Sequence, residues 1–274
     1  MSEWHDLYVK NASVYQPILE AGLSSAPSEA KGLAKIFEAN GLRLKGASKP
    51  RILDVSCGIG RHSVQLAKLG YEVVGFDFSP YFLRTARRLA KAEGLGKESV
   101  RFVEGDTKEI RRMLEGRGEA GFDAIICMDT SIVRKSLKEE VDLLHSLHEL
   151  AREGALLVIE TANRDNFLKH QPYLRLPIIQ SFPEARLQRH LQASYDAERG
   201  FIVGEWRFYR EQTNKDLKHL LSINIESNIH SRKDLREALE SAGWKYVRSY
   251  GSVQRLDRLT SDSYHIVMVA RKAS

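Results

Sequence analysis

The segment at residues 52–63, ILDVSCGIGRHS, constrains the fold more than any other part of the chain. Residues 51–55 have the composition of a buried strand, and a helical pattern runs from the end of the segment to Leu69. Between the two, Gly58 and Gly60 supply a turn with dihedral angles closed to most residues, and they let a ligand approach the backbone. This order predicts the first strand–turn–helix unit of a parallel sheet, with a ligand site at the turn.

The alternation of strand and helix continues along most of the chain. Further strands are expected at residues 72–76, 100–103, 123–128, 155–159, 245–250 and 264–270. Ser79 followed by Pro80 is a typical helix start, and Ser231 to Asp234 has the form of a capping box. The pattern predicts an α/β fold: a seven-stranded, mostly parallel, doubly wound sheet with an antiparallel last strand.

An acid at the end of the second strand narrows the ligand class. Asp77 lies at about the spacing expected for a residue that binds ribose hydroxyls. It could instead cap the following helix, but Ser79 already fills that role. A dinucleotide site would need glycine or alanine at Ser63, and the chain has no GxxxxGK[ST] phosphate loop. A ribose-containing ligand other than a dinucleotide or nucleoside triphosphate fits best.

Two segments carry a resemblance to a known family. Asp54-Val-Ser-Cys-Gly-Ile-Gly60 resembles the first motif of class I S-adenosylmethionine-dependent methyltransferases, an acid followed by GxGxG, with Ser56 in place of the first glycine. Residues 122–131 are similar to the fourth motif, which lies beneath the reactive methyl group. The similarity continues through residues 143–160 and the final helix and strands. The insertion and residues 250–272 resemble the small-molecule methyltransferases of this class.

The resemblance implies S-adenosyl-L-methionine as cofactor and S-adenosyl-L-homocysteine as product. It implies that Asp54 orders the glycine loop near the methionine amino group and that Asp77 holds the ribose hydroxyls. It also implies that Asp106 with Thr107 borders the adenine. Asp106 could also be only a helix cap, and His62 could either donate toward the cofactor carboxylate or pack against a neighbouring helix. The expected cofactor-binding residues are Asp54, Ser56, Cys57, Gly58, Gly60, Asp77, Phe78, Asp106, Thr107 and Met128. No metal is expected.

The residues after the fourth motif are the candidates for catalysis. Asp129 is expected to orient or deprotonate the acceptor, with a solvated loop acid as the alternative. Thr130 and Ser131 would lie beside the methyl group, and Tyr8 belongs to an aromatic N-terminus that could enclose a substrate. These three are the candidate substrate contacts.

A small-molecule acceptor is favoured over nucleic acid. Neither Cys57 nor Cys127 lies in the Pro-Cys setting of pyrimidine carbon methylation, and Met-Asp-Thr-Ser differs from the Pro-Pro-aromatic segment of exocyclic nitrogen methylation. The net charge of +6 is spread along the chain, in clusters that fall on predicted helices. Two alternatives stay open: an RNA 2′-hydroxyl methyltransferase, and a non-catalytic partner subunit that binds S-adenosylmethionine.

The chain is expected to form a single domain over residues 1–274. The expected parts are an N-terminal helical cap (1–45), a cofactor-binding half (46–162), an insertion (163–228) and a C-terminal completion of the core sheet (229–274). In the cap, Ser28 is expected to begin a helix. The insertion, a helical piece with antiparallel strands, is either a substrate lid or an interface between copies of the chain. Without a signal-peptide pattern or a membrane-length apolar run, a cytoplasmic protein without membrane contacts is expected.

Overall fold

A seven-stranded sheet forms the centre of the computed structural model, which describes residues 3–44, 49–129, 131–133, 136–170 and 177–273. Its strands are β1 (Arg51–Val55), β2 (Glu72–Asp77), β3 (Val100–Glu104), β4 (Phe122–Cys127), β5 (Ala151–Ala162), β10 (Trp244–Tyr250) and β11 (His265–Lys272). The order is β10-β11-β5-β4-β1-β2-β3. Strands β1 to β5 pair in parallel, whereas β11 is antiparallel to both β5 and β10. The predicted fold class is confirmed.

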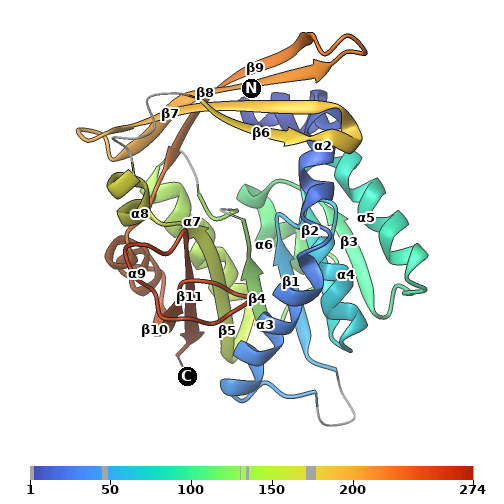
Figure 1. Cartoon of the computed structure of the whole chain (residues 1–274). Helices are drawn as coiled ribbons and strands as arrows, with labels where there is room; N and C mark the ends of the chain where they lie inside the picture. Colours follow the sequence, from blue (N-terminus) through green and yellow to red (C-terminus); the bar gives the residue numbers. More distant parts are fainter. Residues whose placement is uncertain (1–2, 45–48, 130, 134–135, 171–176, 274) are drawn as a thin grey trace.

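Helices cover both faces of this sheet (Figure 1). One face carries α3 (Ala26–Ala39), α4 (Arg61–Lys68) and α5 (Pro80–Ala92), and the other carries α6 (Ile110–Glu115), α7 (Leu137–Leu150) and α9 (Arg232–Ser241). The predicted caps at Ser79 and Ser231 are present, the latter as a complete capping box with Asp234. The helix predicted here is present, but its predicted start was wrong, because Ser25 is the N-cap and Ser28 lies inside the first turn. Pro27 fits that turn, since the first backbone N–H groups of a helix have no intrahelical partner.

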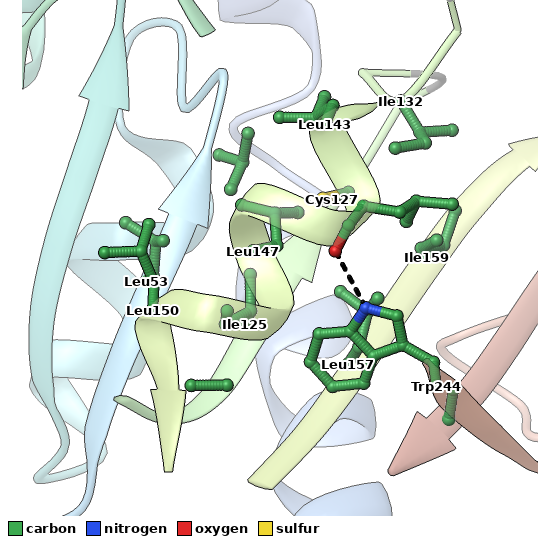
Figure 2. Close-up of a cluster of buried hydrophobic side chains, with 14 of the residues drawn as sticks. Leu53, Ile125, Cys127, Ile132, Leu143, Leu147, Leu150, Leu157, Ile159 and Trp244 are labelled. Atoms are coloured by element: carbon green, nitrogen blue, oxygen red, sulfur yellow. Dashed lines mark hydrogen bonds between the residues drawn. The ribbon is translucent and has the colours of Figure 1, made fainter. Parts of the chain in front are cut away.

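A cluster of apolar side chains fills the space between the sheet and α7 (Figure 2). Leu53, Ile125 and Leu157 extend from three strands of the sheet toward Leu147 of α7. Trp244, at the start of β10, is 1% exposed and its indole N–H donates to the Leu144 carbonyl oxygen at 2.9 Å. The tryptophan therefore joins α7 to the edge of the sheet by packing and by a hydrogen bond.

Replacing this tryptophan should destabilise the fold. Trp244→Ala is expected to lower the free energy of unfolding by about 3–5 kcal/mol, because it opens a large cavity in the core. Urea denaturation followed by circular dichroism measures the change. As a control, Tyr264→Ala removes a side chain that is 73% exposed and should change the value by less than about 0.5 kcal/mol. A loss below about 1 kcal/mol for Trp244→Ala would contradict the packing described.

A second, antiparallel sheet lies across the carboxyl ends of the parallel strands (Figure 1). Its strands, in spatial order, are β6 (Ile178–Phe182), β7 (Leu187–Asp196), β8 (Phe201–Glu211) and β9 (Leu217–Asn228), and the short helix α8 (Arg164–His170) precedes them. One face of this sheet packs on the N-terminal segment, which comprises α1 (Glu3–His5), a π-helical turn (Asp6–Lys10) and α2 (Ala12–Ala21). None of the helices within the described ranges is long and apolar enough to cross a membrane.

Candidate active site

The glycine loop between β1 and α4 is fixed to the end of β2 by backbone hydrogen bonds. The N–H of Cys57 donates to the Phe76 carbonyl oxygen at 3.0 Å, and the N–H of Gly58 donates to Oδ2 of Asp77 at 2.8 Å. Ser56 has a φ of 56°, so this serine adopts the left-handed conformation that glycine adopts most easily. Gly60 has a φ of 76°, and a Cβ there would come within 2.9 Å of the Ala86 Cβ. Gly60 therefore serves the packing of α4 on α5 as well as the turn.

Two buried acids flank this loop. Asp54 is 2% exposed and accepts a 2.5 Å hydrogen bond from the Ser63 hydroxyl, and burial raises the pKa of Asp54. Asp77 is 5% exposed, and its Oδ1 accepts the N–H of Ser79 at 2.8 Å. Burial raises the pKa of Asp77 to about 6, although the backbone N–H groups of Ser79 and Gly58 lower it. Backbone N–H groups thus hold both oxygens of the Asp77 carboxylate in place. Acceptance of the two neighbouring hydroxyls of a ribose by this carboxylate stays a prediction.

The loops after β3 and β4 lie at the same edge, because β1 to β4 are parallel. Asp106 accepts the N–H of Lys108 at 2.9 Å and caps a 3₁₀ turn, Thr107–Glu109. The structure thus gives Asp106 a helix-cap role, and contact with adenine stays a prediction for it and for Thr107. Met128 follows β4, and its carbonyl oxygen accepts the N–H of Ser131 at 3.1 Å. Thr130 lies outside the described residues.

Tyr8, far away in the sequence, lies beside the acid of β2. The Ser79 hydroxyl donates to the Tyr8 carbonyl oxygen at 2.6 Å, and the Tyr8 ring centroid is 6.1 Å from that of Phe78. The ring is also 5.0 Å from Tyr15, which stacks with Trp206 of β8 at 6.4 Å. An aromatic layer therefore connects the end of β2 with the second sheet.

Neither cysteine is placed as a nucleophile. Cys57 is 8% exposed, and burial raises the pKa of its thiol well above the usual value. Cys127 is fully buried in the core cluster. Among the described residues, no group of three or more His, Cys, Asp or Glu side chains is arranged to hold a metal ion.

Comparison with known proteins identifies a methyltransferase domain. A family model described as "Methyltransferase domain" matches residues 52–154, from β1 into β5. The chain is also 24% identical over 232 residues to a glycine/sarcosine N-methyltransferase from Aphanothece halophytica, covering 84% of this chain and 78% of that protein. The family model, this relative and the fold support a class I S-adenosylmethionine-dependent methyltransferase.

Solved structures share the fold of this methyltransferase over nearly its whole length. An S-adenosylmethionine-dependent methyltransferase from Clostridium acetobutylicum ATCC 824 superposes with a TM-score of 0.74 at 13% identity, over 97% of this chain and 98% of that one. CalS10, an amino pentose methyltransferase from Micromonospora echinaspora with bound S-adenosylmethionine, gives 0.65 at 20% identity, over 93% and 97%. Both likenesses span the second sheet as well as the core.

Arg61, the residue directly after the last glycine of the loop, was not predicted from the sequence. Arg61 is 9% exposed and forms ion pairs with Glu29 of α3 and with Asp129, the latter at 2.5 Å. His62 also contacts Glu29, through Nε2 at 2.8 Å, and so packs against the neighbouring helix. Burial raises the pKa of Glu29, but the His62 hydrogen bond and the Arg61 charge bring it down to about 2. The signal in the sequence for this residue was an arginine directly after the last glycine of the loop.

The ion pair with Arg61 bears on the predicted role of Asp129. The Asp129 side chain is 57% exposed, and it has a positive φ of 53°. Its Oδ2 accepts a hydrogen bond from the Arg61 guanidinium, so one oxygen of the carboxylate is already engaged. Whether Asp129 orients or deprotonates an acceptor stays a prediction.

Glu160 of β5, which was also not predicted from the sequence, is a buried acid at the same edge of the sheet. Ile159 pairs with Cys127 of β4, so Glu160 lies level with Met128 at the carboxyl edge. It is 6% exposed, and burial, followed by the charge of Asp129, raises its pKa to about 7. An acid at the end of an apolar strand run, as at Asp77, was the signal in the sequence.

Proposed function

We propose that this methyltransferase transfers the methyl group to the nitrogen of a small amine. The observation that carries the proposal is Glu160, a buried acid whose pKa of about 7 suits it to accept a proton near neutral pH. Two similar proteins support an amine acceptor: one is a glycine/sarcosine N-methyltransferase and the other an amino pentose methyltransferase.

The chemistry needs a proton acceptor. S-adenosylmethionine supplies, when bound, an activated methyl group on a sulfonium. An ammonium nitrogen has no lone pair until it loses a proton, which Glu160 accepts in this proposal. The neutral nitrogen then forms its bond to the methyl carbon as the carbon–sulfur bond breaks, and the electron pair stays on sulfur. Holding the two reactants in line is the other contribution of the protein.

The cover over the carboxyl edge supports a small acceptor. The aromatic layer of Trp4, Tyr8, Tyr15 and Trp206 lies between the N-terminal segment and β8. We infer that residues 163–228 serve as a substrate cover rather than as an interface between copies. In this proposal the cofactor residues are those predicted above, with Arg61 added to order the loop.

A labelled-methyl assay tests the proposal. The protein is incubated with ¹⁴C-methyl-labelled S-adenosylmethionine and, separately, with glycine, sarcosine, an amino sugar, glycolate or transfer RNA. Glycolate is a matched control, because a hydroxyl replaces the amine of glycine. Label in at least one amine, with none in glycolate, is the expected result. Label in RNA alone, or cofactor binding without transfer to any acceptor, would overturn it in favour of the two alternatives.

A further inference from the structure

Arg189 of β7 is a buried cation. It is 8% exposed, and no carboxylate of the described residues lies within ion-pair distance of its guanidinium. Its nearest neighbours are neutral. The guanidinium carbon lies 4.6 Å from the Trp206 ring centroid and 5.8 Å from that of Tyr15. Burying a charge costs free energy unless it is paired, so this arrangement calls for an anion.

The hydrogen bonds of Arg189 leave one end of the guanidinium available. Nε and Nη2 both donate to Oε1 of Gln180, the former at 3.0 Å, and Nη1 donates to the Tyr15 hydroxyl at 3.5 Å. A guanidinium has five N–H donors. The described contacts use three of them, which leaves one on Nη1 and one on Nη2. One N–H on each terminal nitrogen is thus left to donate to the oxygens of a carboxylate.

The register of the second sheet places Arg189 on the face that packs on the N-terminal segment. Arg189 is paired with Phe208 of β8, and both belong to the sheet face that packs on the N-terminal segment. Burial raises the pKa of Tyr8. The charge of Arg189 lowers this pKa, and the charge of Asp77 raises it further. Tyr8 thus lies within electrostatic reach of both residues, with Arg189 on the side of the second sheet and Asp77 on that of the parallel sheet.

We propose that Arg189 binds a carboxylate of the acceptor, so that the substrate is a small amino acid or another amine that carries a carboxylate. This inference rests on the proposed function. It assigns the two ends of the acceptor to different parts of the molecule: the carboxylate to Arg189 beneath the second sheet, and the nitrogen to the carboxyl edge with Glu160.

Ligand binding without turnover tests this assignment first. Acetate and acetamide are titrated into the protein saturated with S-adenosylhomocysteine, and tryptophan fluorescence reports binding, since Trp206 contacts the guanidinium. The wild type is expected to bind acetate at least about 10-fold more tightly than acetamide, as a hydrogen bond to a charged group contributes about 1.5–3 kcal/mol. Arg189→Met should abolish this preference, and Arg189→Lys should keep part of it.

Arg207→Met is the matched control, because Arg207 lies on the same sheet, is 49% exposed and is paired with Glu205. It should keep the preference, and thermal unfolding establishes that each variant is folded. Equal binding of acetate and acetamide by the wild type, or an unchanged preference in Arg189→Met, would overturn the inference.

Turnover separates this inference from the proposed function. With glycine and glycinamide as acceptors, Arg189→Met should raise KM for glycine at least about 10-fold and leave that for glycinamide within about 2-fold. If amines are methylated but both KM values change alike, the carboxylate assignment fails and the proposed function stands. If acetate binding requires Arg189 but no amine is methylated, the proposed function fails and the anion site stands.

Discussion

Asp77→Ala is expected to lower the affinity for S-adenosylmethionine at least about 100-fold. Each hydroxyl hydrogen bond to this carboxylate should contribute about 1.5–3 kcal/mol, and a ribose has two such hydroxyls. The carboxylate also accepts the N–H of Gly58, so its removal frees the glycine loop as well. Calorimetric titration with S-adenosylmethionine and S-adenosylhomocysteine measures both affinities.

The control for this experiment is Asp142→Ala, on the exposed side of α7, which should leave both affinities unchanged.

The pH dependence of cofactor affinity gives a second check on the role of Asp77. Burial raises the pKa of Asp77 to about 6, so cofactor affinity should fall as pH drops through that value and the carboxylate becomes protonated. The free energy of unfolding depends on pH in the opposite direction. The raised pKa of Asp77 stabilises the folded state below pH 3.8, the pKa in the unfolded chain, and this stabilisation is lost as pH rises through about 6. An affinity in Asp77→Ala within about 3-fold of wild type would refute the ribose role.

Glu160→Gln should give the second large effect, a fall in kcat of about 10²–10⁴-fold with an amine acceptor. Glutamine keeps the shape of the side chain but cannot accept a proton, so cofactor affinity should change by less than about 3-fold. In the wild type, kcat/KM should rise with pH through about 7, and this limb should be absent in the variant.

The charged groups that act on Glu160 are Asp129 after β4, Arg61 and His62 on α4, and Glu29 on α3, while His265 on β11 lies 3.9 Å away. Asp129→Asn distinguishes Glu160 from Asp129 as the proton acceptor. It removes a charge that acts on Glu160, and it tests the role expected for Asp129 from the sequence. A loss of turnover in Asp129→Asn with normal activity in Glu160→Gln would assign the proton acceptor to Asp129 instead.

The sequence predicted those parts of the site that depend on local pattern. Asp54, Gly58 and Gly60 belong to one strand–turn–helix segment, and Asp77 ends the next strand, so the parallel sheet brings them together. Their arrangement follows from strand order alone.

The residues missed by the sequence analysis depend on contacts between distant elements. Arg61 forms an ion pair with Glu29, 32 positions away in the sequence. The raised pKa of Glu160 depends on its burial beside the contacts between α3 and α4. Arg189 lies in an alternating strand, where an arginine is typical of a solvated face; only the packing of β7 on the N-terminal segment buries it. The shift of the α3 start from Ser28 to Ser25 is a smaller case, since either serine has the chemistry of an N-cap.

A crystal structure of the protein with S-adenosylhomocysteine would test the central claim most directly. The account predicts the ribose hydroxyls on the Asp77 carboxylate, the amino acid part of the cofactor at the glycine loop near Asp54 and Arg61, and the sulfur directed toward Met128 and Glu160. Density for the cofactor outside the carboxyl edge of β1 and β2, or with the ribose away from Asp77, would contradict it.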